Sequence, residues 1–433
     1  MISYFIEINL LYNRYNYLMK NLSISKVVIL VLIPLFSLYI GFLFGEDLST
    51  GGSKIDFYKT FPAVTDFSNL IFNTTHLHTR HFPFHYLILS IPHFMFDDIY
   101  VTRNFYLLFS LLLPVFVYLN LNQIYKQSKK NNLIISFSLI FLPFFKASAI
   151  WPNAHLTAVI FLTIANYFYI HTLQSNKFIY KFLNIFFLSI SAYCIQSYAI
   201  FFIFYLFNYY QNISIKNFLV IIFFCTVFSL PGLFLILSIP KDGLAGLEFT
   251  ENFSYTIITN LSIIFFFLTF FLINKNNILI MKKYLLNLEF YEIILIVFLF
   301  CLLLLNYKGI TAAGGGFFYK LSLFLFKNKI LYFLSSFFGL LVFYLFFKNE
   351  RKIFYIILLL NFTAIAYYTS QKYFEPLLII SILIFYKNFL VKNIIDNLKN
   401  TLIFYFIIFN YFIIALINSS YGLSSGGYIL KLF

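Results

Sequence analysis

Charged side chains are scarce in this chain: they make up only 10 % of its 433 residues, and acidic residues are half as common as basic ones. Cysteine is rarer still, with three residues far apart inside apolar segments, Cys194, Cys225 and Cys301. This spacing indicates neither a disulfide framework nor a cysteine-ligated metal site. A signal-peptide cleavage pattern is also lacking after the first long apolar segment, 27–44, so we expect this segment to remain as a membrane span.

Apolar residues are abundant, at 61 % of the chain, and the mean hydropathy is +0.87. These values place the chain in the membrane class. The net charge of +15 does not require a nucleic-acid partner, because Lys and Arg gather in the connectors between alternate apolar segments, as expected for cytoplasmic loops. The few acidic residues gather on the opposite, outer side, where we therefore look for function.

The order of the apolar segments predicts an all-α polytopic membrane protein with about 13 transmembrane helices, the N-terminus in the cytoplasm and the C-terminus outside. We expect one membrane domain, 1–433. Its parts, in chain order, are a cytoplasmic N-terminal segment 1–26, an outer loop 46–103, a helical bundle 104–418 and an outer tail 419–433.

Three apolar segments do not fit a simple crossing. Segment 82–96 is short and carries two prolines and two histidines, so we interpret it as interfacial or re-entrant. Segment 57–72 is amphipathic and predicts short helices on the membrane surface. Segment 182–210 has about 29 residues, or about 43 Å as a helix, which is too long for one crossing of a 30 Å core. We therefore predict two short helices there, with a turn near 194–198.

The outer loop holds the densest group of polar side chains, between 45 and 85. Glu46 and Asp47 directly follow the first span, and Asp56 follows a Gly-Gly-Ser turn. A carboxylate at a membrane rim can act as a general base toward a hydroxyl group. The alternative is that these carboxylates are solvated helix ends or ordinary loop residues.

The same loop carries His76, His78, Arg80, His81 and His85. The spacing of the histidines loosely resembles a metal site, but no His-Glu-x-x-His pattern or adjoining carboxylate completes one. We therefore predict no metal, with a divalent ion as the open alternative. Hydrogen bonds to a phosphate or a sugar are favoured over metal binding, with ordinary interfacial histidines as a further alternative, and the arginine suits bidentate phosphate contacts.

Polar residues outside this loop are fewer. Lys146 lies near the outer end of its span, within reach of the surface by snorkelling. Gln196 lies at the predicted break in 182–210. Lys372 and Tyr373 project from a second outer turn, just before Pro376.

Three short patterns, in this order along the chain, resemble the C-type (GT-C) superfamily of polytopic glycosyltransferases. The acidic pair 46–47 is similar to carboxylates that follow the first span in that superfamily. Segment 81–86 is similar to its His-Pro-Pro-Leu-x-Tyr pattern, although Phe82 replaces the first proline. Segment 371–376 is similar to its Arg-Tyr-x-x-Pro turn, with Lys372 in place of the arginine.

This resemblance implies a multi-pass glycosyltransferase of the bacterial inner (plasma) membrane with no cofactor. It would move a sugar, with inversion, from a polyprenyl-phosphate donor to a lipid or glycan acceptor. A carboxylate would act as the base, and basic side chains would stabilise the leaving phosphate. The implied roles are catalytic for Asp47, Asp56 and Glu46, donor-phosphate binding for Arg80, His81, Lys372 and Tyr373, and substrate binding for His85, His78 and Gln196.

Two other functions remain open. A flippase for lipid-linked oligosaccharides, or a small-solute transporter, also has about a dozen spans, but it commonly has internal repeats and polar groups at mid-membrane. We find no such repeat, and the polar cluster lies at the rim, so the sequence favours an enzyme. A polysaccharide polymerase also acts on lipid-linked glycans, but we expect its large functional loop later in the chain.

Overall fold

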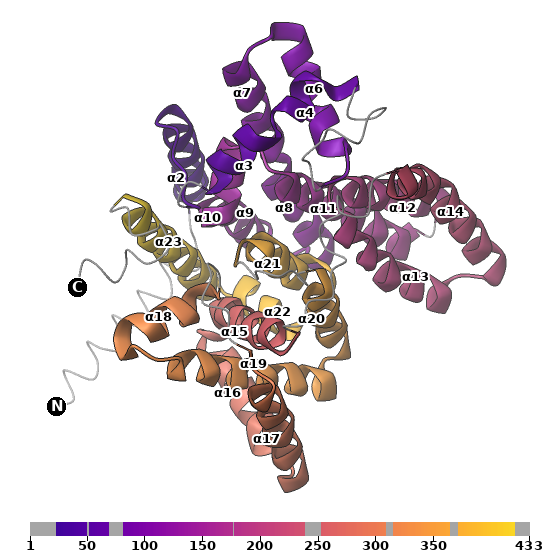
Figure 1. Ribbon diagram of the computed structural model, residues 1–433. Helices are drawn as coiled ribbons and strands as arrows, with labels where there is room; N and C mark the ends of the chain where they lie inside the picture. The colour runs from indigo at the N-terminus through magenta and orange to yellow at the C-terminus, as the bar shows by residue number, and fades with distance from the viewer. Residues whose placement is uncertain are drawn as a thin grey trace.

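The computed structural model describes most of the chain and is helical throughout the part described, where no strand occurs (Figure 1). This confirms the predicted all-α class. The described residues are 23–49, 52–68, 81–175, 177–238, 253–308, 315–363 and 371–420.

The elements of the first half are, in chain order, α2 (Ile24–Leu43), α3 (Gly52–Thr60), α4 (Pro62–Thr65), α6 (Phe84–Phe96), α7 (Ile99–Ser110), α8 (Leu112–Ile124), α9 (Lys129–Ser138), η2 (Leu139–Phe141), α10 (Pro143–Ile150), α11 (Ala154–Ser175), α12 (Phe178–Cys194), η3 (Gln196–Ile200) and α13 (Phe201–Asn212). Those of the second half are α14 (Ile215–Ser238), α15 (Phe253–Leu272), α16 (Lys275–Leu286), α17 (Phe290–Leu305), α18 (Gly316–Phe326), α19 (Ile330–Asn349), α20 (Arg351–Thr363), η5 (Gln371–Tyr373), α21 (Glu375–Ile384), α22 (Phe389–Ile395) and α23 (Leu398–Ser420).

Seven of the described helices are long and apolar enough to cross a membrane, or up to ten if each of three bent helix pairs is one span. Several apolar helices of this kind indicate a multi-pass membrane protein. The predicted count of about 13 is not confirmed, because some of the predicted crossings are short helices and others are the two arms of a bent pair. The bends are 67° between η2 and α10, 100° between α16 and α17, and 83° between α21 and α22.

Two of the segments that did not fit a simple crossing, 82–96 and 182–210, contain short helices, and the interfacial positions predicted for 57–72 and 82–96 stay predictions. Segment 82–96 forms the single short helix α6, of 13 residues. The predicted break in 182–210 is confirmed, because α12 ends at Cys194 and the 3₁₀ turn η3 begins at Gln196. The helices α7 and α8 together form one candidate span, which runs over Ile99–Ile124.

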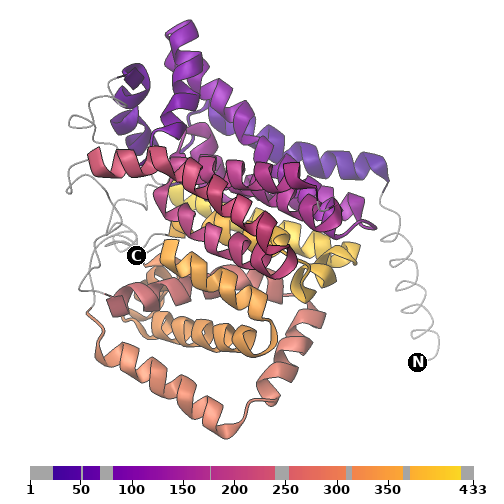
Figure 2. The same cartoon turned by 90° about the vertical axis from the view of Figure 1, so that its right-hand side faces the viewer.

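Two short helices, α10 and α21, form the centre of the molecule. Every residue of both helices is buried. In Figure 1, α21 lies among helices from both halves of the chain, and it packs against α8, α10, α11, α15 and α20. By contrast, α14 and α17 expose most of their apolar side chains, as expected for surfaces that face lipid. Figure 2 shows the N-terminal helices at one end of the molecule and α16 and α17 at the other.

Small and hydroxylated residues bring α15 and α19 close together. The hydroxyls of Ser262 and Ser335 lie 2.6 Å apart, and the Ser336 hydroxyl donates to the carbonyl of Ile258 at 2.8 Å. A Cβ atom on Gly339 would lie 2.3 Å from the carbonyl oxygen of Leu261. Small residues and interhelical hydrogen bonds of this kind are typical of helix pairs in membranes, where lipid is as apolar as leucine.

Candidate functional site

The chain turns sharply where α2 delivers its acidic pair to the rim of the bundle. Gly45 has a φ of +61°, a conformation that glycine adopts without strain. The Glu46 N–H then donates to the Gly41 carbonyl at 2.8 Å and closes the helix end. As a result, the side chains of Glu46 and Asp47 enter different surroundings.

Glu46, whose side chain is 17 % exposed, forms a partly buried ion pair with Lys146 of α10. The Lys146 ammonium donates to the Glu46 carboxylate at 2.8 Å and to the Ser37 hydroxyl at 3.1 Å, and it lies 4.4 Å from the centre of the Phe412 ring. The Lys146 side chain is only 2 % exposed, so it does not snorkel to the surface as expected. This pair ties the buried helix α10 to α2.

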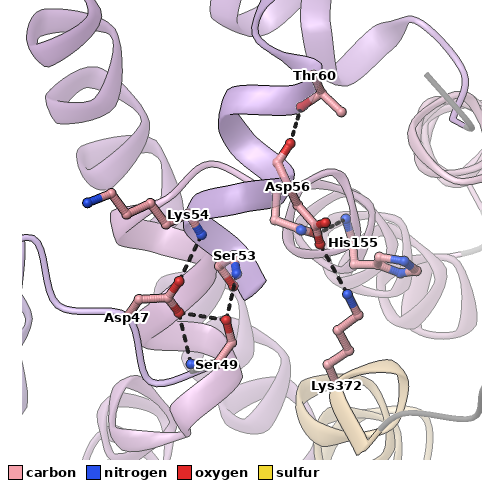
Figure 3. A network of polar contacts seen from close by, with 9 residues as sticks. Asp47, Ser49, Ser53, Lys54, Asp56, Thr60, His155 and Lys372 are labelled. Atoms are coloured by element: carbon pink, nitrogen blue, oxygen red, sulfur yellow. Dashed lines mark hydrogen bonds and ion pairs between the residues drawn. The ribbon is translucent and has the colours of Figure 1, made fainter. Parts of the chain in front are cut away.

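Asp47 caps the N-terminal end of α3, as Figure 3 shows. One carboxylate oxygen accepts from the N–H and the hydroxyl of Ser49, at 2.9 Å and 2.6 Å. The other oxygen accepts from the N–H of Lys54 at 2.8 Å. The Ser49 hydroxyl in turn accepts from the Ser53 N–H at 2.6 Å. Asp47 and Ser49 therefore hold the N–H groups of Lys54 and Ser53, which the first turn of a helix leaves unpaired.

Asp56 lies on α3, two residues after Lys54. Within the described residues, it forms the ion pair between the outer loop and η5. Its carboxylate is 3.2 Å from the Lys372 ammonium, although the two residues are 316 positions apart in sequence. The Asp56 side chain is 46 % exposed and that of Lys372 is 31 % exposed. Figure 3 shows both side chains pointing toward each other from separate elements. This pair is thus open to a ligand.

Aromatic and imidazole rings surround Lys372. Its ammonium lies 5.7 Å from the centre of the Tyr373 ring. The Tyr373 and His155 ring centres are 5.1 Å apart, and those of His155 and His81 are 5.3 Å apart. Residues from the outer loop, the start of α11 and η5 therefore meet at one place, around the Asp56–Lys372 pair.

His85 is in a different position from the other predicted residues, because it is buried at the base of α6. It is 1 % exposed, and its Nδ1 atom is 2.8 Å from the Thr157 hydroxyl of α11. Burial lowers the pKa of His85 to about 3, with a smaller effect of the nearby His81 charge. The imidazole is thus neutral at physiological pH and joins α6 to α11. Its predicted contact with substrate stays a prediction without support from this geometry.

The remaining predicted residues lie elsewhere. Gln196 starts η3, at the break after α12. His78 and Arg80 lie outside the described residues. Within the ranges that are described, no group of three or more His, Cys, Asp or Glu side chains is placed to hold a metal ion.

Sequence reasoning missed two residues next to the candidate site, His155 and Trp151. Trp151 lies in the turn between α10 and α11, where its indole N–H donates to the Glu46 carbonyl at 3.1 Å, and His155 is the second residue of α11. The side chains of Phe57 and Tyr58 on α3 pack against the same indole. The lone tryptophan of the chain, beside a proline in a short connector, was the available signal for this turn.

Comparison of the chain with protein-family models, with curated proteins and with solved structures finds no match in any of the three. The function is therefore argued from the site itself.

Proposed function

We propose that this chain is a membrane glycosyltransferase that moves a sugar from a polyprenyl-phosphate donor to a hydroxyl group of a lipid or glycan acceptor, with Asp56 as the general base. The observation that carries the proposal is the partly exposed Asp56–Lys372 pair. It joins an acid–base group and a cation at the membrane rim, which are the two charges that such a transfer needs.

Among the three loop carboxylates, Asp56 suits the role of base best. Glu46 is committed to Lys146 in a partly buried pair, and both oxygens of Asp47 accept hydrogen bonds at the start of α3. A base must have an accessible oxygen within hydrogen-bond reach of the proton that it removes. Asp56 has that accessibility. We therefore assign the general base to Asp56, whereas the resemblance named Asp47 first among the candidates.

The proposed step is a single displacement at the anomeric carbon. The acceptor oxygen forms a bond to this carbon as its proton passes to the Asp56 carboxylate. The bond between the carbon and the phosphate oxygen breaks on the opposite face, so the configuration inverts. Polyprenyl phosphate leaves with the electron pair, and Lys372 neutralises its added charge. Lys372 thereby exchanges the Asp56 carboxylate for the donor phosphate, which frees Asp56 to accept the proton.

A transfer assay tests this proposal. The wild-type protein in lipid vesicles is given a panel of radiolabelled polyprenyl-phosphate sugars, and Lys372→Met is compared with Lys372→Arg. We expect a loss of about 10²–10³-fold for the methionine variant, as for the removal of one group that stabilises an oxyanion. Arginine, which keeps the charge, should restore most of the activity. No turnover with any donor would contradict the proposal.

A transporter of lipid-linked glycans is a second candidate, because broken helices with charged residues are typical of transporters. The buried helices α10 and α21 carry Lys146 and Glu375, and each belongs to a bent pair. The Glu375 carboxylate accepts from the Phe144 N–H at 2.5 Å and from the Tyr411 hydroxyl at 2.9 Å. Movement of a labelled lipid-linked glycan across the bilayer, lost in Glu375→Gln but kept in Asp56→Asn, would favour this candidate.

A further inference from the structure

Arg103 of α7 is a buried cation outside the site described above. The residue is 8 % exposed, and its guanidinium carbon lies over two rings, 3.6 Å from the centre of Trp151 and 5.2 Å from that of Phe42. Its Nε atom donates to the Ile150 carbonyl at 3.1 Å. Its Nη2 atom is buried and has no hydrogen-bond acceptor among the described residues.

The described residues place no carboxylate within ion-pair distance of Arg103. A guanidinium always carries its charge and has five N–H donors. The faces of the aromatic rings offset part of the cost of burying that charge. An anion is still needed to offset the rest and to accept from Nη2, since a buried charge without a partner is costly.

A second cation lies on the same indole. The Lys54 ammonium is 5.2 Å from the centre of the Trp151 ring, and Lys54 is exposed. Figure 3 shows its side chain extending away from Asp56, so it belongs to a different face of α3 from the candidate site. Only its backbone N–H, and not its ammonium, is bound by Asp47. Both Arg103 and Lys54 thus place a positive charge over the Trp151 ring.

The helix ends beside Arg103 expose large aromatic and apolar side chains. The Phe42 and Tyr100 rings lie 5.1 Å apart, which places the end of α2 beside the start of α7. Both helices belong to candidate spans. Their large side chains near this contact are exposed, with Tyr39 at 53 %, Leu43 at 52 % and Tyr100 at 48 %. Acyl chains can pack on such a face, and Trp and Arg are suited to the headgroup level above it.

We propose that Arg103 and Lys54 bind the phosphate of an anionic lipid at the outer end of α2 and α7. The phosphate would accept hydrogen bonds from the guanidinium, and its acyl chains would lie against the exposed side chains of the two helices. This site is separate from the Asp56–Lys372 pair and does not depend on the chemistry proposed for that pair.

A lipid-binding measurement on the full-length protein tests this inference. Delipidated protein in uncharged detergent is titrated with short-chain phosphatidylglycerol, phosphatidylcholine or inorganic phosphate, and the dissociation constant is measured for each. Lys54→Gln changes an exposed residue and should leave folding intact, with Lys59→Gln, an exposed lysine on the same helix, as its matched control. Arg103→Lys keeps the charge but loses the planar donor fork.

We expect the wild type to prefer phosphatidylglycerol over phosphatidylcholine. Lys54→Gln should weaken phosphatidylglycerol binding by about fivefold, the effect of one basic residue near a lipid surface, and Lys59→Gln should not. Arg103→Lys should weaken it as well and reduce the preference for the anionic lipid. Equal binding of phosphatidylglycerol by wild type and Lys54→Gln would overturn the inference. Displacement of the lipid by inorganic phosphate at equal concentration would overturn the assignment to a lipid.

Discussion

Asp47 and Asp56 are two acidic residues of one loop with different surroundings, and this difference decides their roles. Asp47 is a helix cap with both oxygens in use, whereas Asp56 is half exposed beside Lys372. Because an asparagine side chain has one acceptor oxygen where Asp47 uses two, Asp47→Asn and Asp47→Ala should each lose about 1 kcal/mol. Thermal unfolding in detergent measures both. A loss of several kcal/mol in Asp47→Asn would contradict the capping role.

The partly buried pair of Glu46 and Lys146 makes a second prediction at this scale. Removing the Glu46 carboxylate leaves the Lys146 ammonium, whose side chain is 2 % exposed, without a charged partner, which costs about 3–5 kcal/mol. Glu46→Gln should therefore be strongly destabilised, and the double variant Glu46→Gln with Lys146→Met should recover much of the loss. Denaturant titrations of the two single variants and the double variant measure the coupling. Additive losses would show that the two groups do not interact.

The sequence alone could identify Asp56 and Lys372 as candidates but could not pair them. Their contact joins residues 316 positions apart and depends on how α21 packs in the core. Arg103, Trp151 and His155 were missed for the same reason, since each gains its importance from neighbours that are distant in sequence.

At the scale of elements, the close approach of α15 and α19 depends on Gly339. A Cβ atom there would lie 2.3 Å from a backbone oxygen, which cannot move without shifting α15. Gly339→Ala should therefore separate the helices and cost about 1–3 kcal/mol, as overpacked cores do. Gly52→Ala is a matched control, because its Cβ would meet only a serine side chain, at 3.3 Å. Thermal unfolding measures the stability of both variants. Equal stability of Gly339→Ala and Gly52→Ala would contradict this packing.

Apolar runs were sufficient to predict most helices, but not their bends. The apolar segment 133–150 is not one continuous helix, because the structure breaks it at Leu142 and restarts it as α10 at Pro143. Proline at the first turn of a helix is a usual signal for such a restart. The depth of α10 in the core could not be predicted, because hydropathy does not distinguish a side chain buried in protein from one that faces lipid.

At the scale of the whole molecule, the topology makes a further prediction. If the Lys-rich connector after α8 is cytoplasmic, then Gln127 and Asp97 lie on opposite sides of the membrane, since the span Ile99–Ile124 separates them. With Cys194, Cys225 and Cys301 replaced by serine, single cysteines at 97 and 127 should react with an impermeant maleimide from the outer and the inner side respectively. Labelling of both from one side would contradict the topology.

Sugar transfer by Asp56→Asn, measured beside Asp47→Asn and Asp97→Asn in the same vesicles, tests the central claim most directly. Asp97 is a matched control, because it lies between α6 and α7 with its side chain 97 % exposed. Loss of a general base should reduce the rate of Asp56→Asn by about 10²–10⁴-fold, while the other two variants keep most of their activity. Full activity in Asp56→Asn, or loss in Asp47→Asn alone, would contradict the assignment of Asp56 as the base.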